Sequence, residues 1–438
     1  MSLLLLRALR VGLSTHTLGA CLLSLVMVQP LAHAAESAAT TPLTLQQAVS
    51  AALQSNPQLQ SITFEFRMVD ARAQQAALRP VPEVSIDLEN FAGSGETKRL
   101  QAAEATFALS QVIELGGKRD ARVGVAQAGR SALDIERQAT QLDVLAEVAR
   151  RFIAVAQRQQ EVQLARTAVE LADKTVSASE RRVNAAKSPH AELDRAHIAR
   201  DRYRLEERAV QVELDSARKQ LAATWGASQP VIDGQVFGEV QADLFTLPPI
   251  GDFAELATRL AANPDFLRFA SEARLRDAEL RLAVSQRRPD VTLGAGLRRL
   301  EASKDQAFVA SFSMPLFSGR RAEGFVAEAQ ANRELVDAER RIAEVKAQAT
   351  LYELHRQLTR AVLEAQTLKD DIQPRIAEAL KETEYAYERG RYSYLELVDA
   401  QREYLAVQAT LIEAASSAHT LRAEIERLTN APLTMSTP

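Results

Sequence analysis

Three residues near the middle of the chain have the types and the spacing of metal ligands. His190, Asp194 and His197 stand four and three residues apart, so a helix would carry them on one face. Imidazole and carboxylate groups placed in this way can bind a transition metal. Such residues are more often scattered polar side chains, and we favour that interpretation. The sequence therefore predicts no resident metal and no cofactor.

Two glycine-containing segments lack the full pattern of a nucleotide-binding loop. Gly117-Lys118 has no upstream glycine of a phosphate-binding loop, and Gly294-Ala295-Gly296 is followed by Leu-Arg-Arg instead of the last glycine of a dinucleotide loop. Both segments are better explained as glycines at strand ends or in strands. The single cysteine, Cys21, excludes a disulfide framework and a cysteine zinc site. We expect that the protein is not an enzyme.

The composition indicates long helices. Among 438 residues, 46% are apolar, and glycine (17) with proline (15) makes up roughly 7%, against about 12% in average proteins. Few turn-forming residues mean few interruptions of helix. The 53 basic and 57 acidic residues alternate closely, with a net charge of −4, so the sequence predicts no nucleic-acid-binding surface.

The N-terminal residues have the order of a secretory signal peptide. Arg7 and Arg10 precede an apolar run at 18–28, which is too short to span a membrane, and Ala34 ends a small-residue cleavage site. The alternative is a lipoprotein signal, in which Cys21 would carry the lipid. Because the strongest apolar stretch follows Cys21, we favour cleavage after residue 34. In either case the protein is exported.

The chain contains an internal duplication. Asn56-Pro57 recurs as Asn263-Pro264, 207 residues later, and Glu-Leu-x-x-Ala occurs at 192–196 and again at 396–400. A repeat unit near 200 residues is much longer than the periods of solenoid proteins. The predicted organisation is a signal peptide (1–34), a first helix–strand–strand–helix repeat (35–225), a linker (226–250), a second repeat (251–430) and a C-terminal tail (431–438).

Alternating apolar and polar residues predict four strands, at 84–89, 103–111, 291–297 and 306–315. Taken alone, each could belong to a small soluble sheet with one buried face. A tilted strand of about nine to eleven residues can also cross a bilayer, and the context of very long helices favours this interpretation. Four strands cannot close a membrane barrel, whose smallest forms have about eight, so several chains would have to share one.

Valine recurs at every seventh position of the longest helical segment, from Val148 to Val183. A valine heptad predicts left-handed coiled-coil packing. A helix of 70 residues is about 105 Å long. A cytoskeletal-type rod would also show this pattern, but it would not explain the strand pairs or the signal peptide.

Several motifs together resemble the outer-membrane efflux proteins of the TolC type. They are Leu43-Thr44-Leu45-Gln46-Gln47-Ala48 with the following Asn-Pro, Met314-Pro315-Leu316-Phe317-Ser318-Gly319, and Tyr387-Glu388-Arg389-Gly390 leading into Leu397-Val398-Asp399-Ala400. Within this family, Glu114-Leu115-Gly116-Gly117-Lys118-Arg119 resembles the cobalt–zinc–cadmium resistance branch, which has a Gly-Gly-Lys-Arg turn after the second strand.

The resemblance implies a mainly α fold with a small β part. Long antiparallel coiled-coil helices of a homotrimer would form an α-barrel in the periplasm, and four strands per chain would form a shared 12-stranded outer-membrane β-barrel. The linker at 226–250 would be the equatorial region. The implied location is the outer membrane of a Gram-negative bacterium, in contact with its lipid and extending into the periplasm.

The implied function is a passive conduit for heavy-metal cations of the cobalt, zinc and cadmium type. Its partners would be a periplasmic adaptor protein and an inner-membrane pump of the resistance–nodulation–division class, which would supply the energy. Alternative cargoes are drugs or secreted polypeptides. An alternative from another class is a periplasmic coiled-coil scaffold without a pore.

The resemblance also assigns the periplasmic mouth of the channel. The turns that would dock the adaptor contain Lys187, Ser188, Pro189 and Gly390. Glu396 and Asp399 match two acidic residues, three apart, that line the closed mouth in the family, although the first is commonly aspartate. Six carboxylates around a narrow axis in a trimer would repel one another, raise some pKa values and attract cations. Without the resemblance, both would be read as solvated helix charges.

A latch that holds this mouth shut is the last expectation from the resemblance. Tyr387 matches a family tyrosine that keeps the mouth closed through contacts between neighbouring helices. Tyr392 stands where the family's arginine partner is often found, with Arg389 and Arg391 beside it. The alternative is that these tyrosines simply pack at a helix–helix seam.

Overall fold

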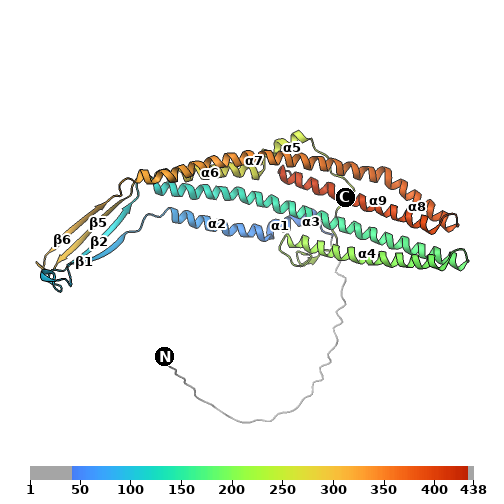
Figure 1. The fold of residues 1–438 in the computed structure, drawn as a ribbon, viewed down its shortest axis with the longest axis horizontal. Coiled ribbons are helices and arrows are strands. Elements are labelled where there is room, and N and C mark those ends of the chain that lie inside the picture. Colours follow the sequence, from blue (N-terminus) through green and yellow to red (C-terminus); the bar gives the residue numbers. More distant parts are fainter. Residues whose placement is uncertain (1–41, 433–438) are drawn as a thin grey trace, which may run out of the picture. The chain divides into compact units, whose positions relative to one another are not determined.

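The computed structural model describes residues 42–432, so the predictions for the signal peptide, for Cys21 and for most of the C-terminal tail lie outside the described residues. Helices form most of this part of the chain (Figure 1). Those of the first half are α1 (Leu45–Ser55), α2 (Pro57–Ala76), α3 (Lys118–Asn184) and α4 (His190–Ala223). Those of the second half are α5 (Phe253–Arg259), α6 (Pro264–Ser285), α7 (Ser318–Thr367), α8 (Gln373–Glu388) and α9 (Tyr394–Leu428). A π-helical segment, Leu368–Ile372, connects α7 to α8.

The duplicated Asn-Pro pair performs the same structural role twice. Asn56 and Asn263 are the N-caps of α2 and α6, and the proline that follows each one occupies the first helical turn, where no amide hydrogen is needed. The side-chain amide of Asn56 donates to the carbonyl oxygen of Thr224 at 2.6 Å. That of Asn263 donates to the carbonyl oxygens of Arg427 and Leu428, at 2.8 and 2.9 Å. Each asparagine thus joins the start of one helix to the C-terminal end of another.

One antiparallel sheet joins the two halves of the chain. Its strands are β1 (Glu83–Glu89), β2 (Glu104–Ile113), β5 (Val291–Leu300) and β6 (Gln306–Ser313), in the order β1-β2-β5-β6. The central pair β2 and β5 connects the halves, with Phe107 opposite Leu297. A short hairpin, β3 (Val231–Ile232) and β4 (Gln235–Val236), lies in the linker. The prediction of a mainly helical fold with a small β part is confirmed.

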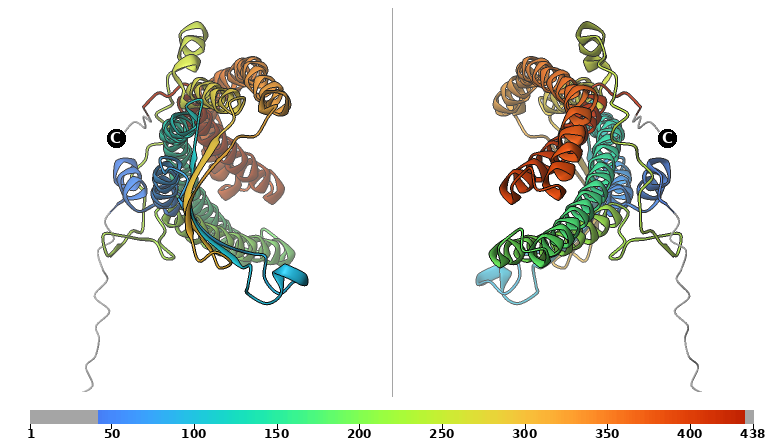
Figure 2. Two further views of the ribbon diagram at one scale, coloured as in Figure 1. Left: turned by 90° about the vertical axis from the view of Figure 1, so that its left-hand side faces the viewer. Right: turned by 90° about the vertical axis from the view of Figure 1, so that its right-hand side faces the viewer.

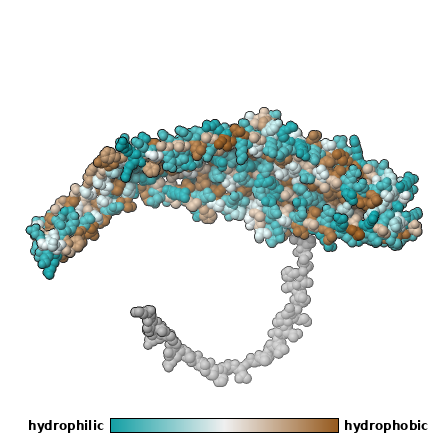
Figure 3. Space-filling view, in the orientation of Figure 1, coloured by the Kyte–Doolittle hydropathy of each residue, from teal (hydrophilic) through white to brown (hydrophobic). Residues whose placement is uncertain are grey.

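The two faces of the four-stranded sheet differ in polarity. Ile86, Phe107, Leu297 and Phe308 form one row across all four strands, and each is at least 48% exposed. Figure 3 shows apolar side chains along these strands. The opposite face carries mainly small and polar residues, and Arg298 there donates to Thr106 and pairs with the carboxylate of Glu104. An exposed apolar face of this extent is unusual for a protein surrounded by water.

The glycine turn at residues 114–119 holds the strands to the helices. Gly116 and Gly117 both have φ near +75°, a conformation that favours glycine, and a side chain at Gly116 would meet the Cγ atom of Arg288 at 2.7 Å. Lys118 pairs with Asp290 at 2.7 Å, across the two halves of the chain. This motif therefore has a structural role at the junction between sheet and helices.

Helix α3 is the centre of the helical packing. It contacts α4, α6, α2, α9 and α1. Of the heptad valines, Val148, Val155, Val162 and Val176 are buried. Seen from the end at which they turn (Figure 2, right), α3–α4 (green) and α8–α9 (red) are two hairpins, one from each half. No helix between residues 42 and 432 is both long and apolar enough to cross a membrane.

The linker is fastened to the helices through its main chain. Side chains of α3, α7, α9 and the π-helical segment bond to carbonyl oxygens between residues 240 and 251. The pairs are Gln159 with Val240, His419 with Leu244, Lys369 with Phe245, Arg422 with Pro249, and His355 with Gly251. Gln159 also accepts from the amide of Val240 at 2.8 Å. The linker thus has a defined path without a large core of its own.

Candidate functional site

Two helix turns lie at the end of the helices opposite the sheet (Figure 1). The first, between α3 and α4, contains Lys187, Ser188 and Pro189, and the second, between α8 and α9, contains Gly390. Gly390 has φ +73°, which favours glycine there. Lys187, Pro189 and Gly390 are exposed, whereas Ser188 is half-buried and accepts from Arg182 Nε at 2.9 Å. The residues predicted as docking tips thus stand at the exposed ends of two hairpins.

Tyr387 links the two hairpins just behind these turns. Its side chain is buried, and its hydroxyl donates to Glu192 Oε1 at 2.7 Å and bonds Ser179 Oγ at 2.8 Å. Because the carboxylate can only accept, the serine hydroxyl is the donor to the tyrosine oxygen. Burial raises the pKa of Tyr387 to about 12, and the adjacent Glu192 carboxylate contributes to this. The phenol therefore stays protonated and joins α8 to α3 and α4.

Arg182 provides the cation at this tyrosine. Its guanidinium carbon lies 4.5 Å from the centre of the Tyr387 ring, and Nη1 donates to the carbonyl oxygen of Tyr387 at 2.8 Å. Such a cation above an aromatic face is stabilising. A second link between the hairpins is the ion pair of Arg181 with Glu388 at 3.1 Å. Both arginines come from α3.

The other residues predicted for the latch do not meet the Tyr387 hydroxyl within one chain. Arg389 stacks on the ring of Tyr385 at 4.6 Å, and Arg391 and Tyr392 are exposed. Sequence reasoning missed Ser179, Arg182 and Glu192. A signal for Glu192 was present, because the duplicated Glu-Leu-x-x-Ala pattern pairs it with Glu396.

Glu396 and Asp399 lie on the first turns of α9, on its solvent-exposed surface. The Ser393 amide donates to Glu396 Oε2 at 2.6 Å, and the Glu396 amide donates to Ser393 Oγ at 3.3 Å, which makes a capping box. The bond from the Ser393 amide lowers the pKa of Glu396, which stays ionised at neutral pH. The Asp399 side chain is 80% exposed and lies 3.7 Å from Arg402. Both carboxylates are thus charged groups on the exposed surface of α9, each with one partner in its own helix or cap.

A layer of buried polar groups lies one to two turns further from the tips. Thr175 and Gln401 are buried and bond to each other at 2.9 Å. Glu384 lies beside them, and burial raises its pKa. Its Oε1 atom has no hydrogen-bond partner among the residues that the structure describes. These groups border a hollow of about 600 Å³ between α3, α8 and α9.

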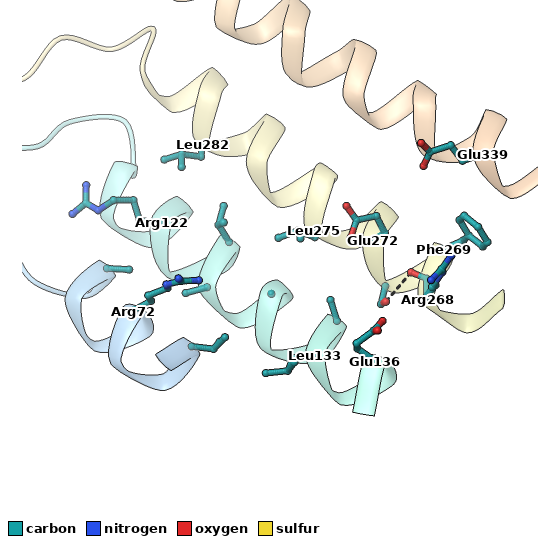
Figure 4. Close-up of a pocket in the computed structure, with 17 residues that line it drawn as sticks. Arg72, Arg122, Leu133, Glu136, Arg268, Phe269, Glu272, Leu275, Leu282 and Glu339 are labelled. Carbon is teal, nitrogen blue, oxygen red and sulfur yellow. Dashed lines mark hydrogen bonds between the residues drawn. The ribbon is translucent and has the colours of Figure 1, made fainter. Parts of the chain in front are cut away.

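A larger hollow, of about 800 Å³, lies away from the turns (Figure 4). It is bordered by α2, α3 and α6 and by Glu339 of α7, and the small residues Ala126, Gly129 and Ala132 of α3 leave space there. Arg122 stands near one end, and Glu136 near the other. Its wall is mostly apolar, and none of the residues predicted for the mouth or latch lines it.

The three residues considered as metal ligands lie near the start of α4. His190 and Asp194 are exposed, and His197 is half-buried. Among residues 42–432, no group of three histidine, cysteine, aspartate or glutamate side chains is arranged to hold a metal ion.

The chain is similar to one protein family and to two characterised metal-resistance proteins. The family model described as "Outer membrane efflux protein" matches residues 48–227 and 256–431. The cobalt-zinc-cadmium resistance protein CzcC of Cupriavidus metallidurans is 27% identical over 388 residues, which cover 86% of this chain and 90% of that protein. The nickel and cobalt resistance protein CnrC of the same organism is 27% identical over 325 residues, or 72% and 73% of the two chains.

Solved structures show a similar fold. The Campylobacter jejuni CmeC outer membrane channel matches with a TM-score of 0.69 and 15% identity, over 90% of this chain and 87% of its own. The outer membrane protein VceC of Vibrio cholerae matches with a TM-score of 0.64 and 19% identity, over 89% of this chain and 97% of its own.

Proposed function

The chain belongs to the outer membrane efflux protein family, and from this membership we propose that it is the outer-membrane channel of a three-part system that exports heavy-metal cations. The main support for heavy-metal cations as the cargo is the match to the cobalt-zinc-cadmium resistance protein, which extends over most of both chains. The match to a nickel and cobalt resistance protein supports the same class of cargo.

A trimer is the assembly that we propose. Within residues 42–432, β1 and β6 each pair on one side, so the sheet has two open edges. Open edges cannot stand in hydrocarbon, because their amide and carbonyl groups would lack partners. Three copies would close twelve strands into one barrel, with the row of Ile86, Phe107, Leu297 and Phe308 facing lipid.

The turns and the acidic residues form the periplasmic end of the proposed channel. An adaptor protein would dock on Lys187, Ser188, Pro189 and Gly390, which the fold presents at its ends. Glu396 and Asp399 would form an acidic mouth that favours cations and that multivalent cations block. Cargo would pass without chemical change, and the energy would come from a partner pump in the inner membrane.

The contacts of Tyr387 support a closed resting state of this mouth. Its hydroxyl ties α8 to α4 through Glu192 and to α3 through Ser179, so separating the two hairpins would break both bonds. Arg182 would lose its contact with the ring as well. The latch residue of the proposal is therefore Tyr387, with Ser179, Arg182 and Glu192 as its partners.

A deletion strain tests the cargo. We expect lower tolerance to zinc, cobalt, cadmium or nickel, restored by the wild-type gene, with unchanged tolerance to a drug panel. Unchanged metal tolerance with lost drug tolerance would contradict the metal assignment and favour a drug channel. Extraction of the protein from isolated membranes distinguishes the two classes of protein. A membrane channel needs detergent for its release, whereas a periplasmic scaffold is released by a salt wash.

A further inference from the structure

Exposed arginines surround the junction between the sheet and the helices. Arg79 follows α2, Arg119 begins α3, and two pairs follow α6 and begin α7. The six are Arg79, Arg119, Arg287, Arg288, Arg320 and Arg321, called here the arginine collar. None has a carboxylate within 4.0 Å in the part of the chain that the structure describes, although Arg119 Nε donates to the carbonyl oxygen of Ala77 at 2.6 Å.

Contacts between neighbouring segments hold the collar in one place. Arg119 joins the start of α3 to the end of α2 through Ala77, and Lys118 joins it to Asp290 before β5. Ser318 Oγ donates to the carbonyl oxygen of Arg287 at 2.9 Å, which joins the start of α7 to the end of α6. The four crossings between strand and helix therefore lie together, and their arginines share one end of the sheet.

The charge at this end is unbalanced, and at the other end it is balanced. The junction segments 77–83, 114–122, 286–290 and 314–323 contain eight basic and five acidic residues, a net charge of +3 in a chain whose net charge is −4. The segments at the far end of the sheet, 89–104 and 298–306, contain five of each sign. The excess of positive charge is thus specific to the end that joins the helices.

Exposed apolar side chains adjoin the collar on the strand side. Leu78, Val81, Leu316 and Phe317 lie within a few residues of its arginines, and Phe317 is 81% exposed. Figure 3 shows apolar residues on the strands and hydrophilic ones where the strands reach the helices. A surface that passes from apolar to cationic within a few residues fits the boundary between acyl chains and headgroups.

We propose that the arginine collar binds the phosphate headgroups of anionic glycerophospholipids in the periplasmic leaflet of the outer membrane. The proposal rests on the proposed function, which places the sheet in the bilayer and the helices in the periplasm. Guanidinium groups bind phosphate through paired hydrogen bonds, and these arginines have no carboxylate that competes for them. The collar would set the depth of the sheet in the membrane.

Lipid association to the purified full-length trimer tests this proposal. Spin-labelled phosphatidylglycerol and phosphatidylcholine are compared in phosphatidylcholine vesicles by electron spin resonance. We expect wild-type protein to prefer phosphatidylglycerol by roughly threefold at low salt and to lose this preference at about 1 M salt. This measurement needs no variant, so it does not depend on the folding of a mutant.

Two variants locate the effect. In the variant R287Q/R288Q/R320Q/R321Q, the ratio of phosphatidylglycerol to phosphatidylcholine association should fall close to one. The matched control R202Q/R208Q/R356Q/R375Q removes four exposed arginines that lie on the helices and, among the described residues, have no ion pair; it should keep the wild-type preference. A wild type without preference, a collar variant that keeps it, or a control that loses it equally would overturn the proposal.

The same spectra separate this inference from the proposed function. Motionally restricted lipid without selectivity would contradict the collar and leave the membrane channel in place. A spectrum with no restricted lipid at all would contradict insertion of the sheet, and with it both proposals.

Discussion

The hydroxyl of Tyr387 donates to the carboxylate of Glu192 at 2.7 Å, although 195 residues separate them in the chain. One comes from the end of α8 and the other from the first turn of α4. This bond is one of several that connect the second half of the chain to the first at the end where both hairpins turn. Because Tyr387 is buried, loss of its hydroxyl leaves polar partners unsatisfied and lowers the stability of the folded protein.

Tyr387→Phe should loosen this end of the molecule. The change keeps the ring under Arg182 but leaves Glu192 and Ser179 without the hydroxyl, which should reduce the free energy of unfolding by about 1 to 3 kcal/mol. In planar bilayers we expect a larger single-channel conductance than for wild type. Tyr385→Phe is the control, because that hydroxyl is exposed and has no hydrogen bond within residues 42–432. Equal conductance of all three proteins would argue against the latch.

The two asparagine caps predict comparable losses of stability. Asn263→Ala removes a cap and two bonds to carbonyl oxygens at the end of α9, so it should lower the free energy of unfolding by about 2 to 4 kcal/mol. Asn56→Ala removes one such carbonyl bond and two bonds from amides in the first turn of α2, again three hydrogen bonds in all, so it should cost a similar amount. Denaturant unfolding measures both, with Asn332→Ala in α7 as a control. A loss no larger than that of the control, in either asparagine variant, would refute this account.

His419 predicts a dependence of stability on pH. Burial lowers its pKa below the ordinary value of 6.5, and Nε2 bonds the carbonyl oxygen of Leu244. Between the folded pKa and 6.5 the unfolded chain binds more protons, so stability is complete above pH 6.5 and falls as the pH falls below it. Comparison of unfolding at pH 7.5 and 5.5 checks this.

His419→Gln separates this effect from the titration of carboxylates. Glutamine can still donate to Leu244 but does not titrate, so the fall in stability between pH 7.5 and 5.5 should be smaller than in wild type. His190→Gln, at an exposed position, should keep the wild-type dependence. Identical pH profiles for His419→Gln and wild type would show that His419 does not contribute.

The acidic residues of α9 predict cation preference. Glu396→Gln with Asp399→Asn removes both charges, while glutamine at 396 can keep the capping box with Ser393. The reversal potential in a salt gradient should then report weaker cation selectivity, and block by multivalent cations should decrease. Glu403→Gln, an exposed position further along α9, is the control and should resemble wild type. Unchanged selectivity and block in the double variant would remove the acidic mouth from the proposal.

Features set by local spacing could be predicted from the sequence. Alternation located the strands to within a few residues, and the repeated Asn-Pro pairs indicated two equivalent helix starts. Both depend on neighbours along the chain, because strand faces alternate and an N-cap acts on the next turn. The capping box of Ser393 and Glu396 was also readable, although sequence reasoning assigned Glu396 to the mouth alone.

Contacts between distant segments could not be predicted in the same way. Sequence reasoning sought the cation of Tyr387 among Arg389 and Arg391, its neighbours in the chain, whereas Arg182 of α3 lies on the ring. Which helices face each other depends on the packing of whole hairpins. The resemblance to a family identified Tyr387, whereas its partners Ser179, Arg182 and Glu192 became evident only in the folded structure.

The fastening of the linker has a consequence for how the protein can change. The helices hold residues 240–251 by their carbonyl oxygens, which every amino acid possesses. Mutations at the exposed positions of this segment can therefore alter side chains without removing these anchors, whereas Val240 and Leu244 are buried in the core shared with the helices. Exposed linker positions such as Gln241 and Ile250 are thus suited to carry a fluorescent label without disturbing the frame that holds the segment.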